Sequence, residues 1–359
     1  MEFALRQEDP ELSSQTVDSY RYAARLVAGV VSSGYLSMVR SVPQMYRYIY
    51  GRAERATGTG RFREWAQRLT ARNLRELLLA ERPDVVVCTH AFPCGAMAEY
   101  KRLYPYDSPI VVGVVTDFAV HAFWAHANVD AYVVAHEAQV EDLTARGVPR
   151  SRICAVGIPT LPSFATPRAA KMALRAELGI PQDRQSVLLM GGGLGMGPIE
   201  RMLSALSPMR NRIGAVVLAG HNPRLIRKLD GLERELGFPI RVVDFVDNVQ
   251  DYMHACDILL TKPGGLSSAE ALVAGIPMVL YHPLPGQEER NASFLLEHGA
   301  ARKARSTREV TAIVERLLDD ARAGRELRTA AHRLARPQAA SDAADIVLES
   351  IRRIHRGVA

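Results

Sequence analysis

The sequence predicts an α/β protein made of two doubly wound domains, and three observations support this fold class. The 359 residues are more than one ordinary domain needs and suit two domains, each with a core of its own. Short β-branched runs such as residues 84–88 and 110–115 lack polar alternation, which is typical of parallel strands covered on both faces. Helical patterns separate these runs, and the whole succession occurs twice along the chain.

The first block begins with apolar residues at helical spacing over residues 62–80, a pattern that Pro83 ends. Its expected strands are residues 84–88, 110–115, 132–135 and 153–156, and its further helices are residues 95–103 and 136–146. A proline-rich stretch then opens at Gly157 and contains Pro159, Pro162 and Pro167, so the first domain is expected to span residues 1–160.

The second block repeats this order, and the second domain is expected over residues 161–337. Its expected strands are residues 186–190, 214–219, 240–244, 258–261 and 277–281, with helices between them that include residues 222–236 and 267–274. Residues 338–356 have a helical pattern, and the segment 338–359 is expected to pack back across the first domain. Ligands of such sheets bind outside the carboxyl ends of the strands, which predicts a site facing an interdomain cleft.

The composition, at 48% hydrophobic and 23% charged residues, indicates a globular rather than a disordered chain. No apolar run approaches the length that spans a bilayer, and the N-terminal residues lack the pattern of a secretory signal. The four cysteines have no metal-binding spacing and fit reduced thiols. These features predict a cytoplasmic protein with no bound metal.

Positive charge is concentrated in residues 20–75, which hold eleven arginines, among them Arg47, against the two acids Glu54 and Glu64. The aromatic residues interleaved with them are Tyr20, Tyr22, Tyr35, Tyr46, Tyr48, Tyr50, Phe62 and Trp65. Basic residues mixed with amphipathic aromatic residues favour contact with an anionic membrane surface. A solvated helical face with core aromatics is the second interpretation, and nucleic acid is the least favoured.

The first chemical motif covers residues 188–198, Leu-Leu-Met-Gly-Gly-Gly-Leu-Gly-Met-Gly-Pro, where a strand runs directly into a glycine-rich loop. Pro198 stands where a helix would begin, so free N–H groups and the positive end of a helix dipole would follow the loop. This arrangement favours a phosphate or diphosphate. The loop lacks the Gly-Lys-Ser/Thr of nucleotide triphosphatases, and a plain tight turn is the structural alternative.

The second motif covers residues 261–271, Thr-Lys-Pro-Gly-Gly-Leu-Ser-Ser-Ala-Glu-Ala. Gly264 and Gly265 are expected to form a turn, and Ser267 and Ser268 to cap the next helix and offer hydroxyls to phosphate. Glu270 is expected on the first turn of that helix, where its carboxylate could accept both hydroxyls of a ribose. On spacing alone a simple capping box between Ser267 and Glu270 is the stronger interpretation.

The third motif covers residues 281–291, Tyr-His-Pro-Leu-Pro-Gly-Gln-Glu-Glu-Arg-Asn, directly after an expected strand. Gln287 and Glu288 present an amide and a carboxylate, which suit the hydroxyls of a sugar. An ordinary surface loop is an equally good interpretation of these residues by themselves.

Taken in order, the three motifs resemble the second domain of the glycosyltransferases of family 28. The chain is most similar to the group of monogalactosyldiacylglycerol synthases and processive diacylglycerol glucosyltransferases, and the resemblance covers most of residues 10–335. The lipid II-forming N-acetylglucosaminyltransferase of the cell wall is a more distant relative. The resemblance implies the GT-B fold, with two Rossmann-like domains and UDP held mainly by the second.

The same resemblance implies roles for individual residues of the donor site. Phe245 and Val246 would flank the uracil, and Glu270 would bind the ribose. Gln287 and Glu288 would hold the hexose. The remaining donor residues that it implies are Gly193, Gly195, Gly197, His221, Asn222, Gly264, Gly265, Ser267 and Ser268.

In the first domain, His90 and Asp117 follow two expected strands and are the candidate catalytic residues. His121, Trp124 and His126 follow in a loop that resembles the acceptor region of the family; with Arg47, His121 and Trp124 are the candidate contacts to acceptor or membrane. Purely structural roles are about as well supported for these histidines, and Trp124 could simply pack.

The family pattern begins with a strand, a glycine-rich loop and a histidine that serves as the general base, and these parts have no counterpart here. Residues 1–9 resemble the end of the following helix, which Pro10 breaks, and residues 12–17 resemble the second strand. A start site placed too late is favoured over a real loss, and His90 is the candidate replacement base.

The function implied is the inverting transfer of galactose or glucose from a UDP-sugar to a lipid such as diacylglycerol, at the inner face of the cell membrane. The UDP-sugar is a substrate, and no further cofactor is expected. Two alternatives remain: a UDP-sugar epimerase on the same fold, and a UDP-sugar-binding protein without catalytic activity.

Overall fold

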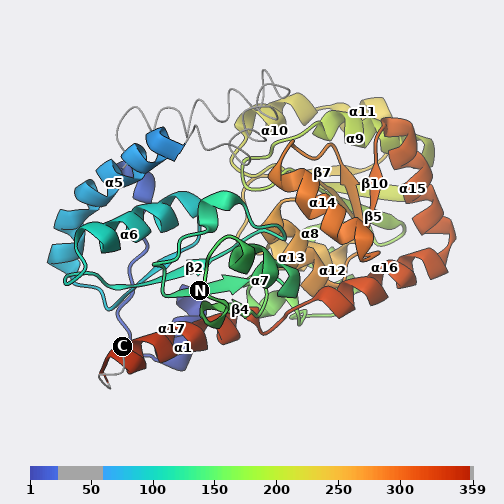
Figure 1. Cartoon of the computed structure of the whole chain (residues 1–359). Coiled ribbons are helices and arrows are strands. Elements are labelled where there is room, and N and C mark those ends of the chain that lie inside the picture. Colours follow the sequence, from blue (N-terminus) through green and yellow to red (C-terminus); the bar gives the residue numbers. More distant parts are fainter. Residues whose placement is uncertain (23–59, 356–359) are drawn as a thin grey trace. The chain divides into compact units, whose positions relative to one another are not determined.

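The computed structural model of this chain describes residues 1–22 and 60–355, and it divides into two units (Figure 1). The first unit combines Met1–Pro159, Pro285–Gln287 and Gln338–Ala359. The second unit combines Thr160–Leu284 and Glu288–Pro337. None of the described helices is both long and apolar enough to cross a membrane.

The first unit contains a parallel sheet in which the strands follow their order along the chain. These strands are β1 (Val85–Cys88), β2 (Ile110–Val114), β3 (Ala131–Val134) and β4 (Ile153–Ala155). The helices of this unit are α1 (Glu2–Glu8), α5 (Gly60–Glu81), α6 (Ala91–Leu103), α7 (Glu137–Ala145) and α17 (Ala339–His355). All four strands were predicted from the sequence to within one residue at each end.

Both faces of this sheet are covered, which explains why its strands lack polar alternation. Along β2, Val111 belongs to a core shared with Met97 and Tyr100 of α6. The neighbouring Val112 points to the other face and belongs to a second core, which includes Val347 of α17. Because alternate residues of one strand enter different cores, every position along it is apolar.

The C-terminal helix α17 lies against this sheet together with the N-terminal helix α1. Small side chains form its inner face: Ala339, Ala343 and Ala344 are almost fully buried. Such side chains let a helix approach a strand surface closely. Two segments from opposite ends of the chain therefore cover the same face of one sheet.

Residues 12–17 do not form the strand that the sequence predicted, although α1 ends before Pro10 as expected. The segment runs beside α1, where the hydroxyls of Ser14 and Thr16 each donate a 3.2 Å hydrogen bond to the carboxylate of Glu2. An extended segment becomes a strand only when its backbone pairs with a neighbour. Here side-chain bonds to a helix take the place of that pairing.

The second unit contains a six-stranded parallel sheet in the order β10-β9-β8-β5-β6-β7. Its strands are β5 (Gln185–Met190), β6 (Ile213–Leu218), β7 (Ile240–Val243), β8 (Ile258–Thr261), β9 (Met278–Tyr281) and β10 (Ala301–Ala304). The sequence predicted the first five. It missed β10, because Ala-Arg-Lys-Ala contains no β-branched residue, and this edge strand exists only through its pairing with β9.

The helices of the second unit also follow the predicted order with local differences. They are α8 (Lys171–Leu178), α9 (Ile199–Leu206), α10 (Pro223–Leu229), α11 (Leu232–Leu236), α12 (Val249–Ala255), α13 (Gly265–Ala274), α14 (Gln287–Glu297), α15 (Thr307–Asp319) and α16 (Ala321–Leu334). The single helix predicted over residues 222–236 is two helices, because Gly231 takes a left-handed conformation with φ of 78°.

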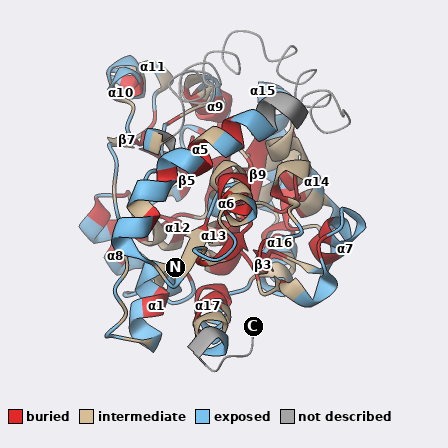
Figure 2. Cartoon of the chain, turned by 60° about the vertical axis from the view of Figure 1, so that its left-hand side comes forward, coloured by how far each residue is buried: buried red, intermediate tan, exposed pale blue. Residues whose placement is uncertain are grey.

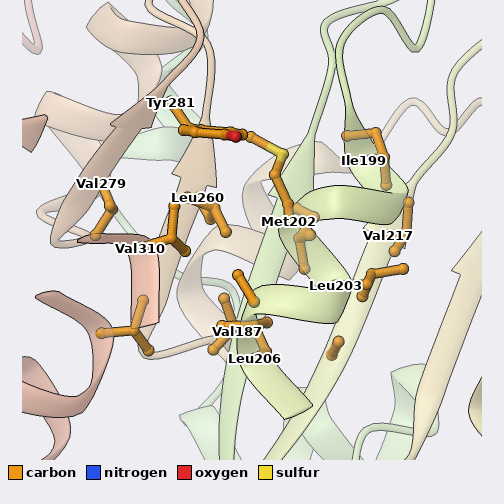
Figure 3. Packing of buried hydrophobic residues seen from close by; sticks show 14 of the residues in the cluster. Val187, Ile199, Met202, Leu203, Leu206, Val217, Leu260, Val279, Tyr281 and Val310 are labelled. Atoms are coloured by element: carbon orange, nitrogen blue, oxygen red, sulfur yellow. The ribbon is translucent and has the colours of Figure 1, made fainter. Parts of the chain in front are cut away.

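The core of the second unit shows how α9 is held above the sheet (Figure 3). Ile199, Met202, Leu203 and Leu206 recur at helical spacing and pack with buried strand residues such as Val187. Figure 2 shows the general pattern, with buried residues on β5 and β9 and exposed residues along α5. This packing fixes the point at which β5 turns into α9, where the glycine-rich motif lies.

Candidate functional site

The glycine-rich loop between β5 and α9 is folded back on itself and against the turn after β6. The N–H of Gly195 donates to the carbonyl of Gly192 at 2.8 Å, and the N–H of His221 donates to the carbonyl of Gly193 at 2.9 Å. Gly195 has a φ of 54°, and a Cβ there would lie 1.9 Å from the carbonyl oxygen of Ala219. Only glycine fits this position, because any side chain would collide with the turn after β6. The two backbone turns can therefore pack this closely only with glycine at position 195.

Other glycines of the motifs face open space. A Cβ built on Gly193, Gly197 or Gly264 would meet no atom of the described chain within 4 Å. At these places a ligand can approach the backbone without a side chain between them. Because α9 begins immediately after the loop, its first N–H groups and its dipole favour an anion there.

The start of α13 corrects the prediction for the second motif. The helix begins at Gly265, with Gly264 as N-cap and no side-chain capping bond within this described segment. Ser267 and Ser268 are therefore inside the helix and do not cap it, and Glu270 lies in the second turn, not the first. The capping-box interpretation was wrong, because the glycine pair lets the helix begin two residues before Ser267.

The two serines also differ in their access to a ligand. Ser268 is fully buried, and its hydroxyl has no hydrogen-bond partner in the described part of the chain. Ser267 is half-buried and lies one helical turn before Glu270, beside the exposed Leu266. In this structure Ser267 is therefore the more accessible of the two serines, and contact of either hydroxyl with a phosphate stays a prediction.

Glu270 is half-buried and has no counter-charge among the described residues. Removal of the carboxyl group from water raises its pKa from 4.5 to about 7. No described residue forms a hydrogen bond or an ion pair with it. A partly desolvated acceptor without a protein partner is stabilised by a ligand that carries hydroxyl donors. A carboxyl group of this kind is typical of a binding site.

Residues at the end of β8 and in the loop that follows connect the second motif to the third motif by hydrogen bonds and an ion pair. The hydroxyl of Thr261 donates to the carbonyl of Met190 at 2.9 Å, which ties the end of β8 to the end of β5. Lys262 forms a 2.5 Å ion pair with Glu288, and the amide of Asn291 donates to the carbonyl of Pro263 at 3.1 Å. Sequence reasoning did not single out Lys262, although a charged residue directly at the end of a buried strand was a usable signal.

Phe245 and His221 lie at the ends of the adjacent strands β7 and β6. Their rings are stacked, with centroids 4.1 Å apart and planes inclined by 10°. Phe245 is 48% exposed, which is unusual for a phenylalanine and leaves ring surface free for another flat group, while Val246 beside it is half-buried.

Asn222 was predicted to line the site, and in the structure its side chain forms hydrogen bonds that hold two loops of the second unit together. Its side-chain oxygen caps α10 by accepting from the N–H of Leu225 at 3.1 Å. Its amide nitrogen donates to the carbonyl of Gly195 at 3.0 Å. The side chain of Asn222 thus connects the glycine-rich loop to the start of α10.

In the first unit, His90 and Asp117 follow β1 and β2 as predicted. His90 is the N-cap of α6, and its Nδ1 accepts from the N–H of Phe92 at 3.3 Å. Surrounding protein lowers the pKa of His90, which favours the neutral ring. Asp117 is half-buried, and its carboxylate accepts a hydrogen bond from the amide of Gln287.

The predicted acceptor contacts His121 and Trp124 are instead interior residues. Trp124 is 3% exposed and belongs to the core that Tyr132 shares, and the hydroxyl of Tyr132 donates to its carbonyl at 2.5 Å. His121 is 4% exposed and caps the turn at residues 122–124 by accepting from the N–H of Phe123. In this structure the loop folds inward and uses both side chains for packing and capping, and their contact with an acceptor stays a prediction.

Arg47, the predicted membrane contact, lies outside the described residues. Within residues 1–22 and 60–355 no three histidine, cysteine, aspartate or glutamate side chains are grouped so that they could hold a metal ion.

Two family models match the chain, one for each unit. The model of monogalactosyldiacylglycerol (MGDG) synthase matches residues 3–160, and the model of the C-terminal domain of glycosyltransferase family 28 matches residues 187–347. The two matches follow one another along the chain in the order expected from the resemblance of the motifs.

Curated relatives match across both units. The chain is 30% identical to the processive diacylglycerol beta-glucosyltransferase of Bacillus mycoides (strain KBAB4), over 88% of this chain and 80% of that protein. It is also 30% identical to the protein of the same name from Bacillus subtilis (strain 168), over 84% of this chain and 78% of that protein.

Solved structures share the fold at low sequence identity. They include Acinetobacter baumannii MurG, with a TM-score of 0.58 at 16% identity over 79% of each chain. The S. aureus MnaA–UDP structure has a TM-score of 0.60 at 14% identity over 80% of each chain. Anabaena Alr3699/HepE in complex with UDP-glucose has a TM-score of 0.53 at 15% identity, over 77% of this chain and 82% of that one.

Two parallel α/β units of this kind, the two family models and the relatives at 30% identity agree with one another. The chain is therefore a glycosyltransferase with the GT-B fold, and it belongs to family 28, in the group of the monogalactosyldiacylglycerol synthases and processive diacylglycerol glucosyltransferases.

Proposed function

We propose that this chain transfers a hexose, glucose or galactose, from a UDP-sugar to a membrane lipid such as diacylglycerol, with inversion at the anomeric carbon. The observations that carry the donor part are the unpartnered carboxyl group of Glu270 on α13 and the open backbone of the glycine-rich loop after β5. The names of the relatives support the lipid acceptor.

For the donor, the motifs of the second unit, together with Gln287, offer groups of suitable chemistry. The exposed ring of Phe245 would stack on the uracil, and Glu270 would accept hydrogen bonds from the ribose hydroxyls. The open backbone at Gly193 and Gly197, Ser267 and the start of α9 would bind the diphosphate and stabilise it as it leaves. Gln287 and Glu288 would bind the hexose hydroxyls.

The acceptor hydroxyl must lose a proton as it attacks, and His90 and Asp117 are the candidates to accept that proton. The capping bond of His90 uses the lone pair of Nδ1, so the neutral ring carries its proton on Nε2 and can only donate there. Asp117 has no such restriction, since an ionised carboxylate has only acceptor atoms and needs no particular tautomer to accept a proton. We therefore favour Asp117 as the base.

The membrane part of the proposal rests on the arginine and aromatic residues within positions 20–75. They would hold the chain on the anionic inner face of the cell membrane, where a lipid acceptor is presented.

A transfer assay with defined vesicles tests this function. The full chain is mixed with UDP-glucose or UDP-galactose and with vesicles containing diacylglycerol and an anionic lipid, and both UDP release and glycolipid are measured. We expect both products to appear together and only when diacylglycerol is present, and Asp117→Asn to lower the rate on the order of 100-fold or more.

Other outcomes identify the alternatives. A changed sugar nucleotide without free UDP would indicate an epimerase. Tight UDP binding without any product would indicate a binding protein, and glycolipid formed equally well on neutral vesicles would contradict the membrane part of the proposal.

A further inference from the structure

The ion pair between Lys262 and Glu288 has no role in the function proposed so far. Lys262 follows β8 directly, and its Nζ lies 2.5 Å from Oε1 of Glu288. The other carboxylate oxygen of Glu288 accepts from the N–H of Leu284 at 2.8 Å. The two side chains are only 18% and 13% exposed, so the pair is much less screened by water than a surface pair.

Lys262 also reaches the glycine-rich loop. Its Cε lies 3.6 Å from the position that a Cβ on Gly192 would take, and it is the one contact that such a Cβ would make among the described residues. The next residue, Gly193, faces open space. The ammonium group therefore lies beside the part of the loop where backbone and helix dipole favour an anion.

An anion at this place would compete with Glu288 for Lys262. A diphosphate carries more negative charge than one carboxylate, so the Coulomb attraction favours the diphosphate. The lysine side chain has four rotatable methylene groups and can turn its ammonium group between two partners without backbone movement. Glu288 would keep its bond to the N–H of Leu284 after the lysine leaves.

We propose that Lys262 is a switch between two anions: it is held by Glu288 in the free chain and moves to the β-phosphate of the sugar nucleotide when the donor binds. The move frees one oxygen of Glu288 to accept a hydrogen bond from a hydroxyl of the hexose. Binding of the diphosphate and binding of the hexose would thus be linked, because Lys262 exchanges its ion pair with Glu288 for one with the phosphate. No proton is transferred in this exchange. This inference rests on the proposed function, since it takes a UDP-sugar as the ligand.

The proposal makes opposite predictions for the two partners of the pair. Glu288→Gln removes the competitor for Lys262, so the affinity for UDP should rise by about 3- to 10-fold, although transfer of the hexose should fall. Lys262→Met removes the cation, so the affinity for UDP should fall by about 10- to 100-fold. The affinity for UMP, which has no β-phosphate, should change less than about 3-fold in either variant.

The test is calorimetric titration of the full chain and its variants with UDP and with UMP, after thermal unfolding has shown that each variant is folded. Lys262→Arg is the matched control, because it keeps the positive charge and should stay within about 5-fold of the parent for UDP. If Lys262→Met does not fold, the sign of the Glu288→Gln effect decides the question.

A purely structural ion pair gives a different result. In that case Glu288→Gln weakens UDP binding as Lys262→Met does, and UMP binding falls in parallel, which would overturn the proposal. Failure of the proposed function is distinguishable from this. A chain that does not take a UDP-sugar would bind neither UDP nor UMP, and a chain that binds UDP without transferring a hexose would still show opposite effects of the two variants on UDP affinity.

Discussion

The strand ends of the two units carry similar kinds of residue, and the fold uses them differently. In the second unit, a Cβ on Gly193 would meet open space, Phe245 is 48% exposed, and no described residue pairs with the carboxyl group of Glu270. In the first unit, His121 and Trp124 are buried and His90 is a helix cap. A residue predicted from a motif is therefore a good candidate for binding only where the fold leaves its polar or aromatic surface unsatisfied.

The largest effect should come from the residue that this comparison assigns to the core. Trp124→Ala removes a buried ring and should lower the free energy of unfolding of the first unit by about 3–5 kcal/mol, while UDP binding persists. Denaturant unfolding and titration with UDP measure the two quantities. Trp65→Ala is the matched control, because Trp65 is 46% exposed and its loss should cost less than about 1 kcal/mol.

The assignment of Trp124 to the core would be wrong if Trp124→Ala left the free energy of unfolding unchanged and raised the KM for the lipid acceptor. That result would make Trp124 an acceptor contact, as the sequence suggested.

The two kinds of glycine in the loop should respond differently to one methyl group. Gly195→Ala places Cβ 1.9 Å from the carbonyl oxygen of Ala219 at a φ of 54°, so it should destabilise the second unit by more than about 2 kcal/mol. Gly193→Ala meets open space, so the melting temperature should hold while UDP affinity falls on the order of 10-fold. Thermal unfolding and UDP titration of both variants provide the measurement.

Equal stability of the two alanine variants would show that the loop is not packed as described. Unchanged UDP affinity of Gly193→Ala would remove the open backbone from the proposed site.

Glu270 should link stability to pH in a direction set by its raised pKa. Its carboxyl group has a pKa of about 7 in the folded chain against an ordinary 4.5, so the folded state holds the proton more tightly and loses stability as pH rises from about 4.5 to 7. Glu270→Gln has no titrating group at this position and does not show this loss. The free energy of unfolding of the variant, relative to the parent chain, should therefore rise between pH 4.5 and pH 7 and stay constant above pH 7, by at most about 3 kcal/mol.

The same substitution should weaken UDP binding by about 10- to 100-fold at pH 8, because a neutral amide is a poorer acceptor for ribose hydroxyls than a carboxylate. Unfolding at pH 5 and pH 8, with UDP titration at pH 8, checks both effects. A stability difference that does not depend on pH would show that Glu270 is paired in the free chain.

The smallest effect is expected for His90→Asn. Asparagine is a good helix N-cap, so α6 should keep its stability to within about 0.5 kcal/mol. Transfer activity should change less than about 3-fold if Asp117 is the base, as measured by UDP release with diacylglycerol vesicles. A loss on the order of 100-fold with normal stability would instead make His90 the base and reverse our assignment for the first unit.

Much of the fold was accessible from the sequence because the buried parallel strands have a local signature. Nine of the described strands, including β1 to β4, consist mainly of apolar residues, many of them β-branched, and this pattern can be recognised without knowing the neighbouring strand. Strand β10 and residues 12–17 were predicted incorrectly, since strand formation at an edge depends on a neighbour that no local pattern reveals.

By itself, the sequence determined the order of the elements, the glycine loop, the position of Glu270 after the glycine pair, and membership of family 28. These follow from local patterns and motifs, which can be read within one segment of the chain. Only the tertiary structure decided that α13 begins at Gly265, that Ser268 and Trp124 are enclosed, and that Lys262 is paired with Glu288. Burial and pairing depend on which distant residues come together, and no single segment of a sequence carries that information.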